Sequence, residues 1–243
     1  SDGGRWFATT PPGWPAVLAL GEAIGAPWII NPALAGLSVL LAHAIVRRRA
    51  GRDAADWVAI VMGSSPWLIS AAATLMTHTL TLALVLAAWV WVLRAGDRGR
   101  SPWAPLFLAG LALGWVFTTR ILDGLIVGTL TGMWVLLEGR TGAARAALRA
   151  AVYGLGCLAT GSLALIYNRL FTGRPLQSPL DRYLAREWGT EGNAYGFGDN
   201  IGPPGGWGAL DLWRGHSPLE AVINTTSNIV SLQIEFLGWP TGS

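Results

Sequence analysis

The chain has 243 residues, of which 52% are hydrophobic and 13% charged, with a mean hydropathy of +0.43. An ordinary soluble domain carries about 25% charged residues, so this composition excludes one and predicts an all-α membrane helix bundle. All 17 basic residues are arginine, which with abundant alanine and glycine is typical of a GC-rich, bacterial genome. The arginines lie in short loops, so the pI near 9.6 does not indicate nucleic-acid binding.

Long uncharged runs define the first spans. Residues 28–46 form one span, which ends before a cluster of arginines. Residues 57–93 carry no formal charge, and as one helix they would measure about 55 Å against a hydrocarbon core of about 30 Å. We therefore expect this run to fold back between residues 66 and 77. A short apolar stretch at residues 14–25 predicts an interfacial or half-buried helix before the first span.

The next apolar run predicts a second hairpin, followed by a last span. Residues 103–137 are interrupted only by Arg120 and Asp123, so we expect these two residues at the tip of the hairpin. Residues 148–167 form the last span, which brings the predicted total to about six. Glycines at four-residue spacing in the hairpin predict close packing between helices. They are Gly110, Gly114, Gly124, Gly128 and Gly132.

The arginines also predict the orientation of the spans. Three loops carry three or four arginines each, namely 47–52, 94–100 and 138–149. By the positive-inside rule these loops face the cytoplasm, and the turns near 66–77 and 120–123 face the outside. We expect a multi-pass protein of the plasma (inner) membrane, with a transmembrane region over residues 1–167 and an extracytoplasmic segment over residues 168–243.

The outer segment, residues 168–243, differs from the rest in composition. It holds 12 glycines and 6 prolines, and its aromatic residues favour an ordered loop over a flexible linker. Within it, Ser217-Pro218-Leu219-Glu220 is a capping box that begins an amphipathic helix over residues 217–237. We expect this helix to lie along the membrane interface, with a bundle helix that faces a partner as the alternative.

Few residues of the sequence are candidates for catalysis or for binding a metal or an anion. The sequence has no phosphate-binding loop, nucleophile elbow or zinc-protease motif, and its histidines and single Cys157 have no metal-ligand spacing, so no metal or cofactor is predicted. Charges at a membrane-embedded tip are better candidates. The planar fork of Arg120 is suited to binding a phosphate. His78 can donate to the same anion, or it can simply cap its helix. A local ion pair between Arg120 and Asp123 is the structural alternative.

Several segments, taken in order along the chain, resemble the GT-C glycosyltransferases. The most similar branch contains the dolichyl-phosphate-mannose protein mannosyltransferases and the aminoarabinose transferases. The segments are residues 7–15 with Asn31-Pro32, Ser65-Pro66, residues 76–79, residues 119–123, residues 167–175 with Pro179 and 181–183, and residues 236–240. Together they cover nearly the whole chain, and it is their order that makes the resemblance specific.

This resemblance implies an integral membrane glycosyltransferase that needs no cofactor. It would transfer a sugar from a polyprenyl-phosphate donor to a lipid, glycan or protein acceptor at the extracytoplasmic face. The catalytic carboxylate is expected upstream of Ser1, which makes the chain an internal fragment. The expected substrate-binding residues are Arg120, His78, Asp123, Asp181, Arg182, Tyr183, Tyr195 and Trp207.

Two other functions stay open at this point. A membrane transporter or permease would more often carry charges within its spans and two repeated halves. A non-catalytic membrane scaffold would use the outer segment for protein contacts.

The predicted orientation can be tested by cysteine labelling in intact cells, in a variant that lacks Cys157. We expect an impermeant maleimide to label Trp207→Cys directly, and to label Arg48→Cys and Arg98→Cys only after permeabilisation. Labelling of position 98 from outside would reverse the orientation.

Overall fold

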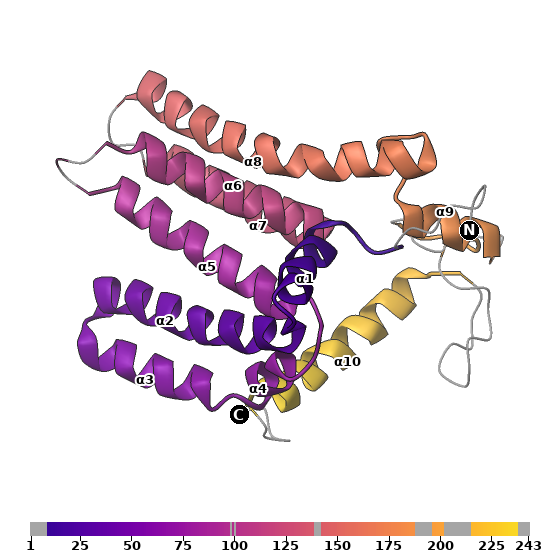
Figure 1. Cartoon of the computed structure of the whole chain (residues 1–243), viewed down its shortest axis with the longest axis horizontal. Helices are drawn as coiled ribbons and strands as arrows, with labels where there is room; N and C mark the ends of the chain where they lie inside the picture. The colour runs from indigo at the N-terminus through magenta and orange to yellow at the C-terminus, as the bar shows by residue number, and fades with distance from the viewer. Residues whose placement is uncertain are drawn as a thin grey trace. The chain divides into compact units, whose positions relative to one another are not determined.

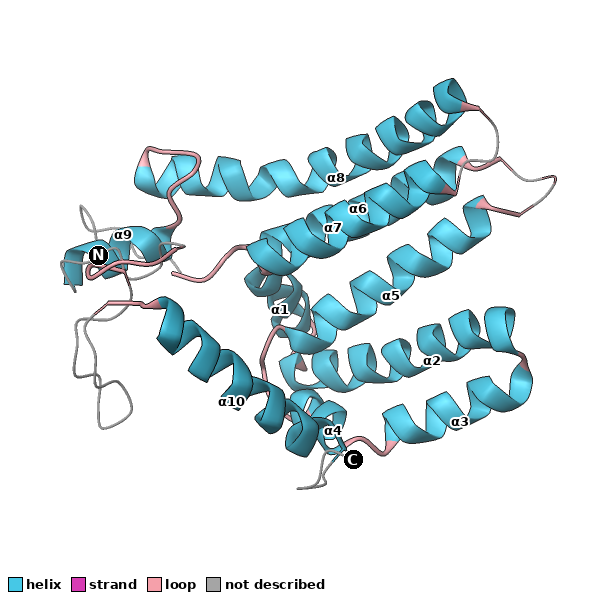
Figure 2. Ribbon diagram, turned by 180° about the vertical axis from the view of Figure 1, so that it is seen from behind, coloured by secondary structure: helices cyan, strands magenta, loops and turns pink. Residues whose placement is uncertain are grey.

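The computed structural model describes residues 9–97, 99, 101–138, 142–187, 196–201 and 215–237, and these residues are almost entirely helical (Figure 1, Figure 2). The predicted all-α fold is therefore confirmed. The elements are α1 (Gly13–Ala23), the 3₁₀ helix η1 (Pro27–Ile29), α2 (Ile30–Ala50), α3 (Arg52–Gly63), α4 (Pro66–Ala72), α5 (His78–Ala95), α6 (Trp103–Thr119), α7 (Ile121–Leu137), α8 (Ala143–Thr172), α9 (Pro179–Glu187) and α10 (Pro218–Leu237).

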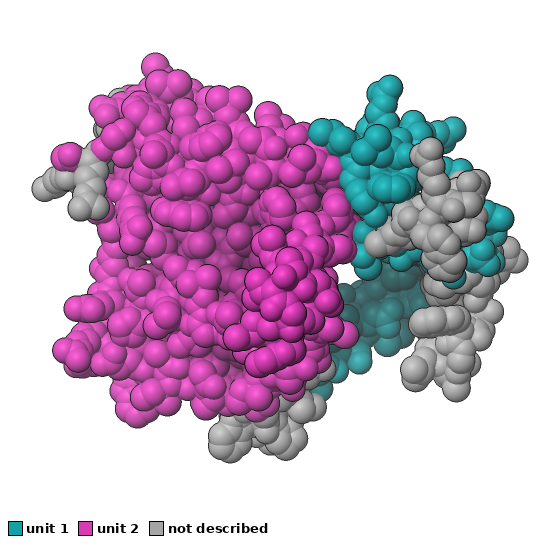
Figure 3. All heavy atoms as spheres, viewed as in Figure 1, with its two compact units in different colours: residues 1–10, 165–243 teal, residues 11–164 magenta. Residues whose placement is uncertain are grey.

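The chain divides into two compact units: residues 11–164, which we call the first unit (magenta, labelled unit 2 in Figure 3), and residues 1–10 and 165–243, which we call the second unit (teal, labelled unit 1 in Figure 3). The predicted boundary after residue 167 falls inside α8, a few residues beyond this division. Helix α8 contains both the end of the last predicted span and the residues at which the two units divide.

Three helical segments in the described ranges are long and apolar enough to cross a membrane, namely Pro27–Ala50, His78–Ala95 and Ala143–Thr172. Helices α6 and α7 are apolar but have 17 residues each, or about 26 Å. Helix α3 has 12 residues, or about 18 Å, which is too short for a hydrocarbon core of about 30 Å. The total of six spans therefore stays a prediction.

The long uncharged run at residues 57–93 folds back as expected. Helix α3 ends at Gly63, because Ser65 is extended (φ −64°, ψ 123°) and Pro66 occupies the first turn of the short helix α4. A proline at this position starts a new helix but cannot continue the old one. Residues 73–77 then separate α4 from α5, so the reversal lies within the predicted stretch.

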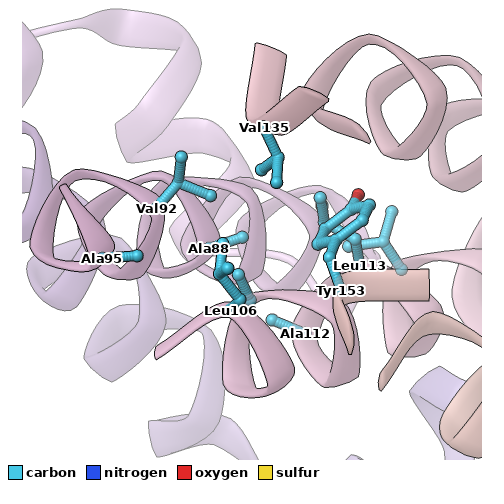
Figure 4. Packing of buried hydrophobic residues seen from close by; sticks show 10 residues of the cluster. Ala88, Val92, Ala95, Leu106, Ala112, Leu113, Val135 and Tyr153 are labelled. Carbon is cyan, nitrogen blue, oxygen red and sulfur yellow. The ribbon is translucent and has the colours of Figure 1, made fainter. Parts of the chain in front are cut away.

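The core of the first unit is built by α5, α6, α7 and α8 (Figure 4). Its buried residues are Ala88, Val92 and Ala95 on α5, Leu106, Ala109, Ala112, Leu113 and Val116 on α6, Val135 on α7 and Tyr153 on α8. The outer faces carry large apolar side chains instead, with Leu40, Trp57, Leu130 and Leu158 each 61–68% exposed. An apolar outer surface around a small core is typical of a bundle surrounded by lipid.

Three of the five predicted glycines, Gly110, Gly114 and Gly124, pack against the backbone of another helix, whereas Gly128 and Gly132 face the side chain of Tyr153. The α-carbons of Gly110 and Gly114 on α6 face the backbone of α8 around Cys157, so closely that a β-carbon at either position would collide with it. On α7, Gly124 meets the backbone of Phe117 in the same way, and a β-carbon at Gly132 would lie 3.2 Å from the ring of Tyr153. These contacts bring α6, α7 and α8 to close backbone distances.

Arginine side chains connect neighbouring helices at the end of the bundle that is predicted to face the cytoplasm. Arg48 forms an ion pair with Asp97 and donates to the carbonyl of Leu93 at 2.8 Å. Arg149 is buried and donates to the carbonyl of Ala95 at 3.4 Å. Both arginines therefore satisfy carbonyls at the C-terminus of α5, where a positive charge is favourable.

Helix α10 begins at the predicted capping box. The backbone N–H of Ser217 donates to Glu220 Oε2 at 3.2 Å, and the N–H of Glu220 donates to Ser217 Oγ at 3.1 Å. From Pro218 to Ser231 its large apolar side chains are exposed. Its place along the membrane interface remains a prediction.

The glycine contacts predict the effect of adding one methyl group. We expect Gly110→Ala to lower the free energy of unfolding by about 1–3 kcal/mol, because the new β-carbon overlaps the backbone of α8. Gly154→Ala on α8 is the matched control, since its β-carbon would meet nothing within 4 Å. Thermal unfolding in detergent measures both, and equal melting temperatures would contradict this packing.

Candidate functional site

Arg120 lies where two helices of the bundle meet. It is the one residue between α6 and α7, and its backbone is extended (φ −141°, ψ 99°). Its N–H donates to the carbonyl of Val116 at 2.7 Å, and its carbonyl accepts from Gly124 at 2.9 Å. The junction thus keeps its backbone bonded to both helices, and Arg120 lies at the tip of the hairpin, as predicted.

The structure brings together three of the predicted binding residues, which we call the Arg120 cluster: His78, Arg120 and Asp123. Arg120 Nη1 donates to His78 Nδ1 at 2.8 Å, and Arg120 Nε forms an ion pair with Asp123. His78 begins α5 and Asp123 lies in the first turn of α7, where a carboxylate is favourable. Residues 42 positions apart in sequence therefore share one site.

The chemistry of the cluster determines which protons it can offer. A guanidinium can only donate, so His78 Nδ1 accepts the bond and the neutral imidazole carries its proton on Nε2. Within the described part of the chain, the bonds of Arg120 use Nε and one N–H of Nη1. Its side chain is 37% exposed. The Nη2 group of Arg120 and the Nε2–H of His78 are thus donors that an anion can use.

The segment before His78 is held by two buried side chains. Asn31 on α2 donates through Nδ2 to the carbonyls of Thr74 and Met76, the second at 3.0 Å, and Trp14 Nε1 donates to the carbonyl of Leu75 at 2.8 Å. Thr79 Oγ1 donates to Asn31 Oδ1 at 2.5 Å. Sequence analysis assigned no role to Asn31 or Trp14. The sequence did contain one indication of the role of Asn31: it is an asparagine within an apolar run, where a buried amide needs hydrogen-bond partners.

One aromatic ring contacts the cluster, and three exposed apolar residues are its neighbours in sequence. The ring of Trp67 on α4 lies edge-on to the imidazole of His78, with 6.0 Å between the ring centroids. Leu75, Met76 and Leu122, next to the cluster in sequence, are each 44–58% exposed. The charged residues are therefore flanked in sequence by apolar side chains that are exposed to the surroundings of the bundle.

The predicted residues of the second unit have local structural contacts. Asp181 and Ser178 cap α9 reciprocally, with two backbone N–H bonds of 3.0 Å. Arg182 Nη1 donates to the carbonyl of Phe171 near the end of α8 at 3.2 Å, and Tyr183 is 48% exposed. The other two predicted residues, Tyr195 and Trp207, lie outside the described residues.

Among the described residues, no group of three or more histidine, cysteine, aspartate or glutamate side chains is placed to hold a metal ion. The Arg120 cluster combines two kinds of hydrogen-bond donor with one carboxylate.

The chain matches no protein-family model, no curated protein and no solved structure.

Proposed function

We propose that this chain is part of an integral membrane glycosyltransferase that uses a polyprenyl-phosphate sugar, and that the Arg120 cluster binds the phosphate of this donor. The sugar would go to a lipid, glycan or protein acceptor at the extracytoplasmic face. The observation that carries the proposal is a partly exposed guanidinium with spare donors, flanked in sequence by exposed apolar side chains. A phosphate on a lipid tail needs both features in one place.

The proposed reaction breaks the bond between the anomeric carbon of the sugar and the phosphate oxygen. The acceptor hydroxyl oxygen forms the new bond to that carbon, and its proton passes to a general base. The leaving polyprenyl phosphate gains negative charge as the bond breaks. Arg120 Nη2 and His78 Nε2–H would stabilise this charge, and charge-assisted bonds of this kind are the strong ones.

The two alternative functions fit the described residues less well. A transport path usually places charged side chains in the middle of the spans. In the described part of the chain the buried charged side chain is Arg149, which caps the end of α5. A scaffold would require neither a lipid phosphate nor the spare donors of Arg120, so phosphate binding separates it from the enzyme.

Removing the guanidinium tests the proposed role. We expect Arg120→Ala to weaken binding of a polyprenyl monophosphate by about 10- to 150-fold, the equivalent of about 1.5–3 kcal/mol for bonds to a charged group. Arg120→Lys should restore part of the affinity, because lysine keeps the charge but lacks the planar fork. Titration calorimetry in detergent measures each affinity, with the unphosphorylated polyprenol as the reference ligand.

Arg48→Ala is the matched control for this experiment. Arg48 is also paired with an aspartate and also bonded to the chain, but it lies at the other end of α5 from His78. Its loss should leave the affinity for the phosphate unchanged. A folded Arg120→Ala protein with the affinity of the parent, or equal binding of phosphate and polyprenol, would refute the proposed role.

A further inference from the structure

The connection between α4 and α5 is held in place by side chains from other helices. Three consecutive carbonyls, those of Thr74, Leu75 and Met76, each accept a bond from a buried side chain on α1 or α2. These residues lie outside any helix, so their carbonyls have no bonds of a regular helix to satisfy them. The position of this connection is therefore determined by Asn31 and Trp14.

Asn31 is bonded on both sides of His78. Its Nδ2 donates to the carbonyls of Thr74 and Met76, which precede the histidine, and its Oδ1 accepts from Thr79, which follows it. Asn31 and Thr79 are both fully buried, at 0% exposure. The amide thus uses both of its donors and joins α2 to the first turn of α5.

We infer that Asn31 is a positioning residue for phosphate binding, which it supports by holding His78 where Arg120 can donate to Nδ1. This inference rests on the proposed function of the Arg120 cluster. Asn31 itself touches neither Arg120 nor Asp123 in the described contacts. Asn31 fixes the backbone at Met76 and Thr79, and this backbone fixes the position of the His78 imidazole. In that position Nδ1 accepts from Arg120, which favours the tautomer that carries its proton on Nε2.

Asn31→Asp is the sharpest variant, because it keeps the volume of the side chain and an acceptor for Thr79 but removes both donors to the carbonyls. We expect it to weaken binding of a polyprenyl monophosphate by about fivefold, the equivalent of one ordinary hydrogen bond. Thr131→Val is the matched control. It removes a buried acceptor from Trp89 Nε1 in the same bundle, about 16 Å along α5 from His78, and should leave this affinity unchanged.

A second measurement reports on the histidine directly. The chain has three histidines, so a ¹⁵N-histidine spectrum can be assigned with His78→Gln. In the parent protein we expect neutral His78 with its proton on Nε2, and in Asn31→Asp a mixture of the two tautomers. Thr79→Val removes one of the bonds of Asn31. It should change the phosphate affinity and the tautomer ratio of His78 in the same direction as Asn31→Asp, but to a smaller extent. This second variant keeps the inference testable if Asn31→Asp does not fold.

A double-mutant cycle separates positioning from a general loss of stability. If Asn31 acts through His78, Asn31→Asp should lower the affinity in the parent but have no further effect in the His78→Gln background. An equal loss in both backgrounds, or an unchanged tautomer in both Asn31→Asp and Thr79→Val, would overturn the inference. Should Arg120→Ala bind phosphate like the parent, the proposed function fails, whereas the tautomer measurement still tests whether Asn31 positions His78.

Discussion

The structure depends on how the polar groups of the backbone are satisfied where its helices break. A bundle with apolar outer faces offers little water to an unpaired carbonyl, so each break needs a partner from within the protein. At residues 73–77 the partners are Asn31 and Trp14, and at Arg120 they are the adjoining turns of α6 and α7. The hydrogen bond between His78 and Arg120 connects the two breaks. The need to satisfy backbone groups at the breaks therefore also determines where the residues of the candidate site lie.

Close approach of the helices supports this arrangement. Helices in lipid gain little from hiding apolar surface, and they associate instead through small residues and bonds between helices. Gly110 and Gly114 let α6 contact the backbone of α8, and Thr160 Oγ1 adds a bond of 2.8 Å to the carbonyl of Leu111. Rigid packing along α6 and α7 keeps the base of the hairpin fixed, and with it the position of Arg120 at the tip.

The sequence was sufficient for the helical class, the reversal before His78, the tip at Arg120 and the glycine contacts, because each depends on local composition or spacing. It could not predict that α3 is too short to span a bilayer, since an uncharged run does not reveal where a helix stops. Nor could it reveal the bonds of Asn31, whose partners lie 43–48 residues away. Asp181 was assigned to substrate from a motif, and the bond from Ser178 N–H to its carboxylate at the start of α9 depends on a local turn that the motif did not reveal.

The single-residue junction at Arg120 also constrains how this chain can change in length. Adding or deleting one residue there would turn α7 by about 100° around its own axis, because a helix has 3.6 residues per turn. Gly124 would then leave the backbone of Phe117, and a residue with a β-carbon would take its place. Most loops between helices accept insertions in evolution, but this one should vary by substitution alone, so that homologous sequences keep an unbroken alignment from α6 through α7.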